Sequence, residues 1–407
     1  MREARRVVVT GMGVVSCLGN TLVSFATALR ESRSGLSRIE AWRSLGLPSQ
    51  VAGRASVALS PSLDRKLLRF VGDTGRFACH AARAAIDDAG LDAARLRARD
   101  VGAVVGSGVG AVSAYDEAMA LVAARGIEKV GPYVVPRVMS STCSAALAYA
   151  HGMQGIVYSP SAACCTSAIA IGQAMQLIQS GAQTIVLAGG SEELHTGTAL
   201  MFGAMGVLAT ASNENSLAAS RPYDEARDGF VMASGAGVLV LEERSHALAR
   251  GARIHAEVTG FGHVTEGGEM IGPGRGSIAA AIRDALGNGG APDYVNTHAP
   301  STPLGDIEEL HALVDVFGGA PPPFSSIKGL CGHALGASGA LDAIATLSMM
   351  RGGFMAGTPN LATRVPLAHN LPLVEQVRDA RIREALSVSF GFGGVAACIA
   401  FRAADSV

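Results

Sequence analysis

The segment Ser161-Ala-Ala-Cys-Cys-Thr-Ser-Ala168 holds the main clue to the architecture of this 407-residue chain. Its small side chains lead into an Ala-rich stretch, 166–181, which is predicted to be a helix that ends at a glycine. A second small-residue segment, Gly332-His-Ala-Leu-Gly-Ala337, opens a predicted helix over 332–350 that also runs to a glycine turn. We interpret the two as copies of one unit, with Cys164 and His333 at equivalent helix starts. Chance similarity among small residues is the alternative.

Strands and helices are expected to alternate on both sides of these segments. In the first half we predict three apolar strands and one further helix, over 7–10, 101–105, 184–188 and 75–90. In the second half we predict a strand, a helix and a strand, over 253–260, 276–287 and 294–297. Such alternation is typical of an α/β fold with layered helices and sheets. The boundary is expected near Arg250-Gly251.

Composition and charge exclude several classes of protein. The chain has 33 basic and 34 acidic residues, so its near-zero net charge favours neither nucleic acid nor an anionic membrane as a partner. Hydrophobic residues make up 49% and charged residues 16%, which excludes a disordered or fibrous chain. No run of 18 apolar residues occurs, so no membrane span is expected.

The cysteine pattern is typical of a cytoplasmic protein with reduced thiols. Seven Cys occur without the spacing of a disulfide framework. Neither a CxxC pair nor an HExxH motif is present, so no metal site is expected. Residues 7–10 read best as a strand, although three arginines before an apolar run that ends at Cys17 loosely resemble a lipoprotein signal.

Cys164 is a candidate nucleophile because it stands where a helix is predicted to begin. The helix dipole and the free backbone N–H groups there favour a thiolate, so the nucleophile could form without an adjacent base. A buried, inert thiol is the alternative. Cys165 competes for the role, but one step along a helix turns its side chain by about 100°.

Two histidines and one lysine have contexts that suggest chemistry. His298 follows a predicted strand, at the carboxyl end where α/β folds place site residues. His333 lies in Lys328-Gly-Leu-Cys-Gly-His333. The chain has three Lys against thirty Arg, so a lysine at 328 suggests a need for a compact ammonium group. A structural role is the alternative for either histidine.

Ordered motifs along nearly the whole chain resemble those of the β-ketoacyl-acyl carrier protein synthases, the decarboxylating condensing enzymes of fatty acid synthesis. The type I branch of the bacterial elongating synthases is the nearest. Besides Ser161-Ala-Ala-Cys-Cys-Thr-Ser167 and Lys328-Gly-Leu-Cys-Gly-His333, the motifs are Val9-Thr-Gly-Met-Gly-Val-Val-Ser16, Asp64-Arg-Lys-Leu-Leu-Arg-Phe70, Gly131-Pro-Tyr-Val-Val135, Leu187-Ala-Gly-Gly-Ser-Glu-Glu193, Arg221-Pro-Tyr-Asp-Glu-Ala-Arg-Asp-Gly-Phe-Val231 and Ser389-Phe-Gly-Phe-Gly-Gly394.

The resemblance implies the thiolase fold, in which duplicated βαβαβαββ halves form a five-layer α-β-α-β-α arrangement. The N-terminal half, 1–250, would carry the nucleophilic cysteine together with the dimer and cap insertions. The C-terminal half, 251–407, would carry both catalytic histidines. The implied partners are acyl carrier protein and either a second copy of the chain or a ketosynthase-like subunit.

The resemblance also implies a Cys-His-His site of Cys164, His298 and His333. Cys164 would take an acyl chain from the phosphopantetheine of the carrier protein, and backbone N–H groups of Cys164 and Phe392 would stabilise the oxyanion. His298 and His333 would stabilise the enolate formed when malonyl-carrier loses carbon dioxide, which yields a 3-oxoacyl-carrier. The enzyme itself would need no cofactor.

Further roles follow from the same resemblance. Lys328 would set the electrostatics around His333, with Glu309 as its buried counter-charge. The pantetheine and acyl tunnel would be lined by Thr302, Phe202, Phe390 and Phe392, although Phe202 and Phe392 could equally be core aromatics. Five basic residues would dock the carrier protein, although they could equally form an ordinary solvated surface: Arg65, Lys66, Arg69, Arg125 and Lys129.

The chain departs from the family pattern around the expected pocket. The usual His-Gly-Thr-Ser-Thr-Pro reads His298-Ala-Pro-Ser-Thr-Pro303, so Pro300 removes both a hydroxyl and a backbone N–H. Polar residues are also replaced at Ile327, Cys331 and Val395-Ala396. These losses, expected at the pocket floor, suggest a specialised enzyme for polyene or other secondary acyl chains. The alternatives are a non-condensing subunit of a heterodimer and a thioester hydrolase or thiolase.

Overall fold

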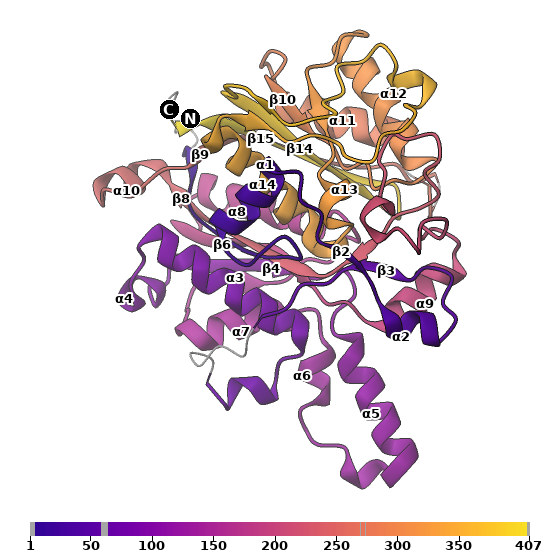
Figure 1. Ribbon diagram of the computed structural model, residues 1–407. Coiled ribbons are helices and arrows are strands. Elements are labelled where there is room, and N and C mark those ends of the chain that lie inside the picture. The colour runs from indigo at the N-terminus through magenta and orange to yellow at the C-terminus, as the bar shows by residue number, and fades with distance from the viewer. Residues whose placement is uncertain (1–4, 58–63, 269, 273, 405–407) are drawn as a thin grey trace.

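Ten hydrogen-bonded strands form the core of the protein, in the order β11-β10-β14-β15-β9-β1-β8-β6-β4-β5. The computed structural model describes residues 5–57, 64–268, 270–272 and 274–404 (Figure 1). Five strands come from the first half: β1 (Val7–Val15), β4 (Val101–Gly106), β5 (Val157–Tyr158), β6 (Ile185–Glu192) and β8 (Gly235–Glu243). Five come from the second: β9 (Ala256–Thr265), β10 (Tyr294–Asn296), β11 (Phe324–Ser325), β14 (Glu384–Gly391) and β15 (Val395–Ala403). Antiparallel pairing of β1 with β9 joins the two sets.

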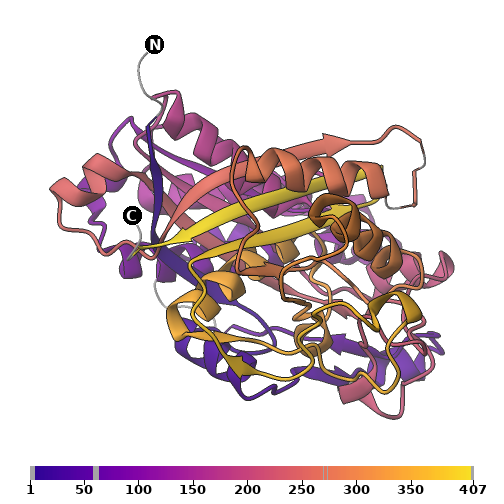
Figure 2. The same ribbon diagram turned by 90° about the horizontal axis from the view of Figure 1, so that it is seen from above.

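Each half follows the order βαβαβαββ, and the thiolase fold expected from the sequence is confirmed. The helices of the first half are α3 (Asp73–Ala89), α7 (Thr142–His151) and α8 (Thr166–Gln179). Those of the second are α11 (Arg275–Leu286), α12 (Gly305–Phe317) and α14 (Ser338–Gly352). Figures 1 and 2 show α8 and α14 between the two sets of strands, with α3 and α7 outside one set and α11 and α12 outside the other. The five layers are therefore α-β-α-β-α.

Smaller elements decorate this core. In Figure 1, α5 and α6 project from the N-terminal half. The other α-helices are α1 (Leu22–Arg30), α2 (Glu40–Ser44), α4 (Ala93–Leu96), α5 (Val112–Arg125), α6 (Val134–Val138), α9 (Thr196–Ala204), α10 (Arg244–Ala249) and α13 (Lys328–Cys331). The shorter strands are β2 (Leu36–Arg38), β3 (Val51–Gly53) and β7 (Met232–Ala233), which form one sheet, and β12 (Phe354–Met355) and β13 (Arg378–Asp379), which form another. No described helix is long and apolar enough to cross a membrane.

Glycine pairs in the first strand of each half let a helix pack directly on the sheet. A Cβ at Gly13 in β1 would lie 1.9 Å from the carbonyl oxygen of Ala81 in α3. In β9, a Cβ at Gly260 would lie 1.9 Å from the carbonyl oxygen of Ala285 in α11. No side chain fits at these distances, so the Gly and Ala content reflects close contact between the layers. The strand predicted over 7–10 is confirmed as the start of the buried β1.

The central helices α8 and α14 are equivalent, but the register inferred from the sequence is wrong. The second helix begins at Ser338 and not at residue 332, because Gly332 and Leu335 both have positive φ, +71° and +47°. Ala163 and Leu335 each adopt a left-handed conformation three residues before their helix. The offset is 172 for both pairs (335 − 163 and 338 − 166), so the counterpart of Cys164 is Gly336 and not His333.

Replacing Gly339 by alanine should destabilise the fold, because a Cβ there would lie 2.7 Å from Ala168 N in α8. We expect Gly339→Ala to lower the free energy of unfolding by about 1–3 kcal/mol, the usual cost of overpacking a core. Gly203→Ala, in a helix with open space around the glycine, is the matched control and should be neutral or slightly stabilising. Denaturant titration measures both, and equal stability of the two variants would contradict the packing argument.

Candidate active site

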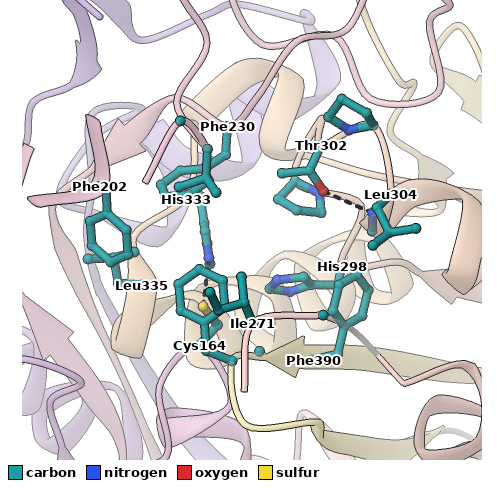
Figure 3. A pocket seen from close by; sticks show the side chains of 18 of the residues that line it. Cys164, Phe202, Phe230, Ile271, His298, Thr302, Leu304, His333, Leu335 and Phe390 are labelled. Carbon is teal, nitrogen blue, oxygen red and sulfur yellow. Dashed lines mark hydrogen bonds between the residues drawn. The ribbon is translucent and has the colours of Figure 1, made fainter. Parts of the chain in front are cut away.

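Cys164, His298 and His333 line one cavity of about 360 Å³. Cys164 lies just before α8, His298 follows β10, and His333 lies between α13 and α14. One side-chain nitrogen or sulfur atom from each lies within 4.8 Å of the other two. Figure 3 shows the three side chains pointing toward one another, with apolar residues around them. The structure thus brings together the three residues that the sequence singled out.

Cys164 is held in a strained turn beside a base. The residue before it, Ala163, has a φ of +48°, a conformation that costs a non-glycine residue about 1–2 kcal/mol. Cys164 Sγ lies 3.0 Å from His333 Nε2. Burial raises the pKa of the Cys164 thiol to about 12, although the charge of Lys328 opposes the rise. His333 is the neighbour that can take the thiol proton.

His333 is fixed from two sides. Its Nδ1 lies 2.8 Å from Ser338 Oγ, and its ring meets that of Phe230 edge-to-face at 5.2 Å. A serine hydroxyl both donates and accepts, so Ser338 fits either neutral tautomer of the imidazole. Burial and the charge of Lys328 hold the pKa of His333 well below its usual value, so the ring is neutral.

His298 is held by its backbone and by its neighbours. The N–H groups of His298 and Ala299 donate to the two carboxylate oxygens of Glu309, each at 2.7 Å. The His298 ring lies edge-on to that of His333, with centroids 4.9 Å apart, and 4.4 Å from that of Phe390. Burial, Lys328 and His333 hold the pKa of His298 well below its usual value.

The counter-charge of Lys328 is Asp342 and not Glu309, which corrects the sequence-based expectation. Lys328 Nζ lies 2.7 Å from Asp342 Oδ2, and both side chains are at most 2% exposed. Glu309 is instead occupied by backbone N–H groups and by the hydroxyl of Tyr223 at 3.3 Å. Neither Lys328 nor Glu309 lines the cavity, so both are positioning residues.

Sequence reasoning missed three residues that support the site. Ser338 and Asp342 stand one turn apart on α14, so one helix face supports both His333 and Lys328. That i, i+4 spacing after the histidine motif was the available signal. Glu192 is also buried and accepts hydrogen bonds from Gly108 N at 2.8 Å and Gly336 N at 3.0 Å. It thereby ties the start of α14 to a loop of the first half.

The expected tunnel residues all line the cavity. The rings of Phe202 and Phe392 stack at 6.1 Å, Phe390 packs on His298, and Thr302 Oγ1 accepts a hydrogen bond from Gly305 N at 3.2 Å (Figure 3). A Cβ at Gly391 would lie 3.0 Å from Cys164 N. The turn that carries Phe392 therefore lies against the backbone of Cys164. The backbone N–H groups expected to stabilise the oxyanion, those of Cys164 and Phe392, come from these two segments.

The five basic residues expected to dock a carrier are exposed and lie outside the cavity lining. They form two groups, in and before η1 (Leu67–Arg69) and from the end of α5 through η2 (Ile127–Lys129). Within the described part of the chain, none of them has an ion-pair partner: Arg65, Lys66, Arg69, Arg125 and Lys129.

Of the positions that depart from the family pattern, Pro300 lines the cavity. Ala299, Ile327, Cys331 and Ala396 are buried and do not line the cavity. The expectation that all these polar losses fall at the pocket floor is therefore wrong.

Residues 4–247 match the family model of the β-ketoacyl synthase N-terminal domain, and residues 255–362 match that of the C-terminal domain. The chain belongs to the β-ketoacyl synthase family. It is 41% identical over 403 residues to 3-oxoacyl-[acyl-carrier-protein] synthase 1 of Haemophilus influenzae, with 98% of this chain and 99% of that protein covered.

Two solved structures of ketosynthases are also similar to this β-ketoacyl synthase. The ishigamide ketosynthase/chain length factor is 31% identical, with a TM-score of 0.91 over 98% of this chain and 100% of that one. The AntDE:AntF complex, a type II polyketide synthase acyl-carrier protein bound to its ketosynthase with a hexaketide, is 29% identical, with a TM-score of 0.89 over 99% of this chain and 100% of that one.

Removing the charge of Lys328 should change the pH dependence of the synthase. In Lys328→Met, the pKa values of His298 and His333 rise toward 6.5, because a positive charge that disfavours imidazolium is gone. The histidines then protonate at a higher pH, so we expect activity on the acid side to be lost at a higher pH than in the wild type. The pH–rate profile measures the shift.

A second variant controls for the carboxylate of Asp342, which loses its ion-pair partner in Lys328→Met. Breaking a buried pair by removing one partner costs about 3–5 kcal/mol, so Lys328→Met alone is expected to be destabilised. Lys328→Met with Asp342→Leu removes both charges and should recover stability while keeping the shifted profile. An unshifted acid limb in both variants would show that Lys328 does not control the histidines.

Proposed function

We propose that this β-ketoacyl synthase uses Cys164, His298 and His333 to extend acyl chains by decarboxylative Claisen condensation with malonyl-acyl carrier protein. The observation that carries the assignment of roles is the convergence of one thiol and two neutral imidazoles in an apolar cavity. The substrates would arrive on the phosphopantetheine of the carrier, so the chain itself needs no cofactor.

The first step transfers the acyl group. Cys164 Sγ attacks the thioester carbonyl while its proton passes to His333 Nε2 at 3.0 Å. Backbone N–H groups of Cys164 and Phe392 would stabilise the oxyanion of the tetrahedral intermediate. The intermediate collapses by breaking the bond to the carrier's sulfur, which leaves with the proton from His333.

The second step forms the carbon–carbon bond. Malonyl-carrier loses carbon dioxide, and the electron pair of the broken bond moves into an enolate whose oxygen accepts hydrogen bonds from His298 and His333. Neutral imidazoles suffice as donors, which fits their lowered pKa values. The enolate carbon attacks the acyl group on Cys164, and the Cys164 sulfur leaves as a thiolate, which takes up one proton from solvent to restore the thiol. The product is the 3-oxoacyl-carrier.

An apolar face supports association with a second ketosynthase-like subunit. Strand β5 is the last in the sheet, and α5, α6, α7 and α9 form a continuous surface with it. Large apolar side chains on this surface are 37–69% exposed: Tyr115, Met119, Val135, Met139, Tyr149, Ile156, Tyr158, Leu200, Met201 and Met205. Such a patch is typical of a protein interface. The partner can be a second copy or a different subunit, and we place the complex in the cytoplasm.

Cys164→Ala should abolish the acyl-enzyme. Incubation of the wild type with acyl-carrier should raise its intact mass by one acyl group, whereas Cys164→Ala should show no adduct. Cys165→Ala is the matched control and should still be acylated, because Cys165 is fully buried and its Sγ donates to Val395 O. A panel of carriers with saturated and unsaturated acyl chains tests whether the enzyme is specialised for particular chains. Equal loading of all of them would exclude such specialisation.

Acyl loading together with analysis of the products separates the alternative functions. A non-condensing subunit would form no adduct even as wild type. A thioester hydrolase would release free acid, and a thiolase would act on coenzyme A thioesters. Carbon dioxide together with a 3-oxoacyl product from malonyl-carrier supports condensation.

Reversing charge in one basic group should weaken carrier binding. We expect Lys66→Glu with Arg69→Glu to raise KM for acyl-carrier about ten-fold or more at low salt, with kcat little changed, because electrostatic complementarity acts mainly on encounter. Steady-state kinetics at two salt concentrations measure the effect. Arg351→Glu, an exposed site at the end of α14 outside both groups, should leave KM unchanged. An unchanged KM in the double variant would exclude this surface as the dock.

A further inference from the structure

The buried ring nitrogen of His298, Nδ1, has no hydrogen-bond partner among the described residues. His333, by contrast, has partners at both ring nitrogens, Ser338 Oγ and Cys164 Sγ. Buried polar atoms are almost always paired, so the exception needs an explanation.

The backbone beside the ring shows where the missing donor belongs. Glu309 accepts the N–H groups of residues 298 and 299, and Asp306 Oδ1 accepts those of Ser301 at 3.0 Å and Thr302 at 3.1 Å. Two buried carboxylates of α12 therefore accept hydrogen bonds from four of the five backbone nitrogens of residues 298–302. The fifth is that of Pro300, which carries no hydrogen.

The chain itself contains the contact that Pro300 cannot make. At His195, the ring Nδ1 accepts a hydrogen bond of 3.1 Å from the backbone N–H of Gly197, two residues further on. Pro300 stands two residues after His298, and it lines the same cavity as the ring. An ordinary residue at 300 would carry a backbone N–H two residues after the histidine, the same spacing at which Gly197 pairs with His195.

The consequence concerns the proton of His298. The ring is neutral, so it carries one proton, on Nδ1 or on Nε2. Because Nδ1 is buried, Nε2 is the nitrogen that a substrate in the cavity can reach. A donor to Nδ1 would fix the proton on Nε2, where an enolate oxygen needs it.

We propose that Pro300 leaves the His298 proton free to exchange between the two ring nitrogens and thereby slows decarboxylation without slowing acyl loading. The inference rests on the proposed function, since the enolate is stabilised by His298, whereas loading uses Cys164 and His333. Pro300 acts as a positioning residue through the hydrogen bond that it withholds. The acyl chain consequently remains longer on Cys164 before it is extended.

Pro300→Ala tests the proposal, because it restores the N–H without adding a polar side chain. In ¹⁵N-histidine NMR, with the signal assigned by His298→Gln, we expect averaged tautomer shifts in the wild type and a single Nε2–H tautomer in the variant. Carbon dioxide release from malonyl-carrier should rise about two-fold in kcat, because a ring that spends about half its time as the Nε2–H tautomer would then spend nearly all of it in that form. The rate of Cys164 acylation should stay the same.

Pro48→Ala is the control, since Pro48 is exposed and does not line the cavity; it should change neither the tautomer nor the rate. A wild-type ring already fixed as Nε2–H overturns the proposal, and that measurement requires no variant to fold. An unchanged tautomer and an unchanged rate in Pro300→Ala overturn it as well. If the tautomer responds but neither protein releases carbon dioxide, the ring assignment is supported and the condensing function fails.

Discussion

Backbone contact between α8 and α14 is the constraint on which the rest of the structure depends. Gly339 touches Ala168 so closely that no side chain fits between the two helices. The contact brings the starts of both helices to one point, and Cys164 and His333 precede those starts. Because α8 and α14 also separate the two sets of strands, the same contact sets the spacing of the five layers. Cys164 and His333 meet where the two halves of the chain meet.

Buried carboxylates hold the turns around this meeting point. Glu309 and Asp306 accept backbone N–H groups on either side of Pro300, and Glu192 ties together segments from both halves. Burial raises the pKa of Glu309 and of Glu192 to about 7, and the backbone N–H groups that they accept oppose the rise. They shape the site without taking part in the chemistry. Rigid turns of this kind keep reacting groups in place at little cost when substrate binds.

The electrostatics of the site come from one ion pair behind the wall of the cavity. The Lys328–Asp342 pair places a fixed positive charge near both histidines and near Cys164. That charge favours neutral imidazoles and partly offsets the effect of burial on the thiol. A scarce lysine in an arginine-rich chain thus acts at a distance, through the pKa values of other groups. The substitutions at Ile327 and Cys331 lie beside this pair in the chain and leave it intact.

The sequence by itself determined the family and the duplicated α/β architecture, and it singled out the three residues that meet in the cavity, because ordered motifs and helix periodicity are local properties of the chain. It also indicated that Lys328 matters. Only the tertiary structure decided that Asp342 balances Lys328, that Cys164 corresponds to Gly336, and that His298 Nδ1 lacks a donor. Each of these depends on side-chain direction or on backbone dihedral angles across long chain separations. Glu309 shows what the sequence could not predict. Its burial and its family position were predictable, but its partners are backbone N–H groups that carry no sequence signal.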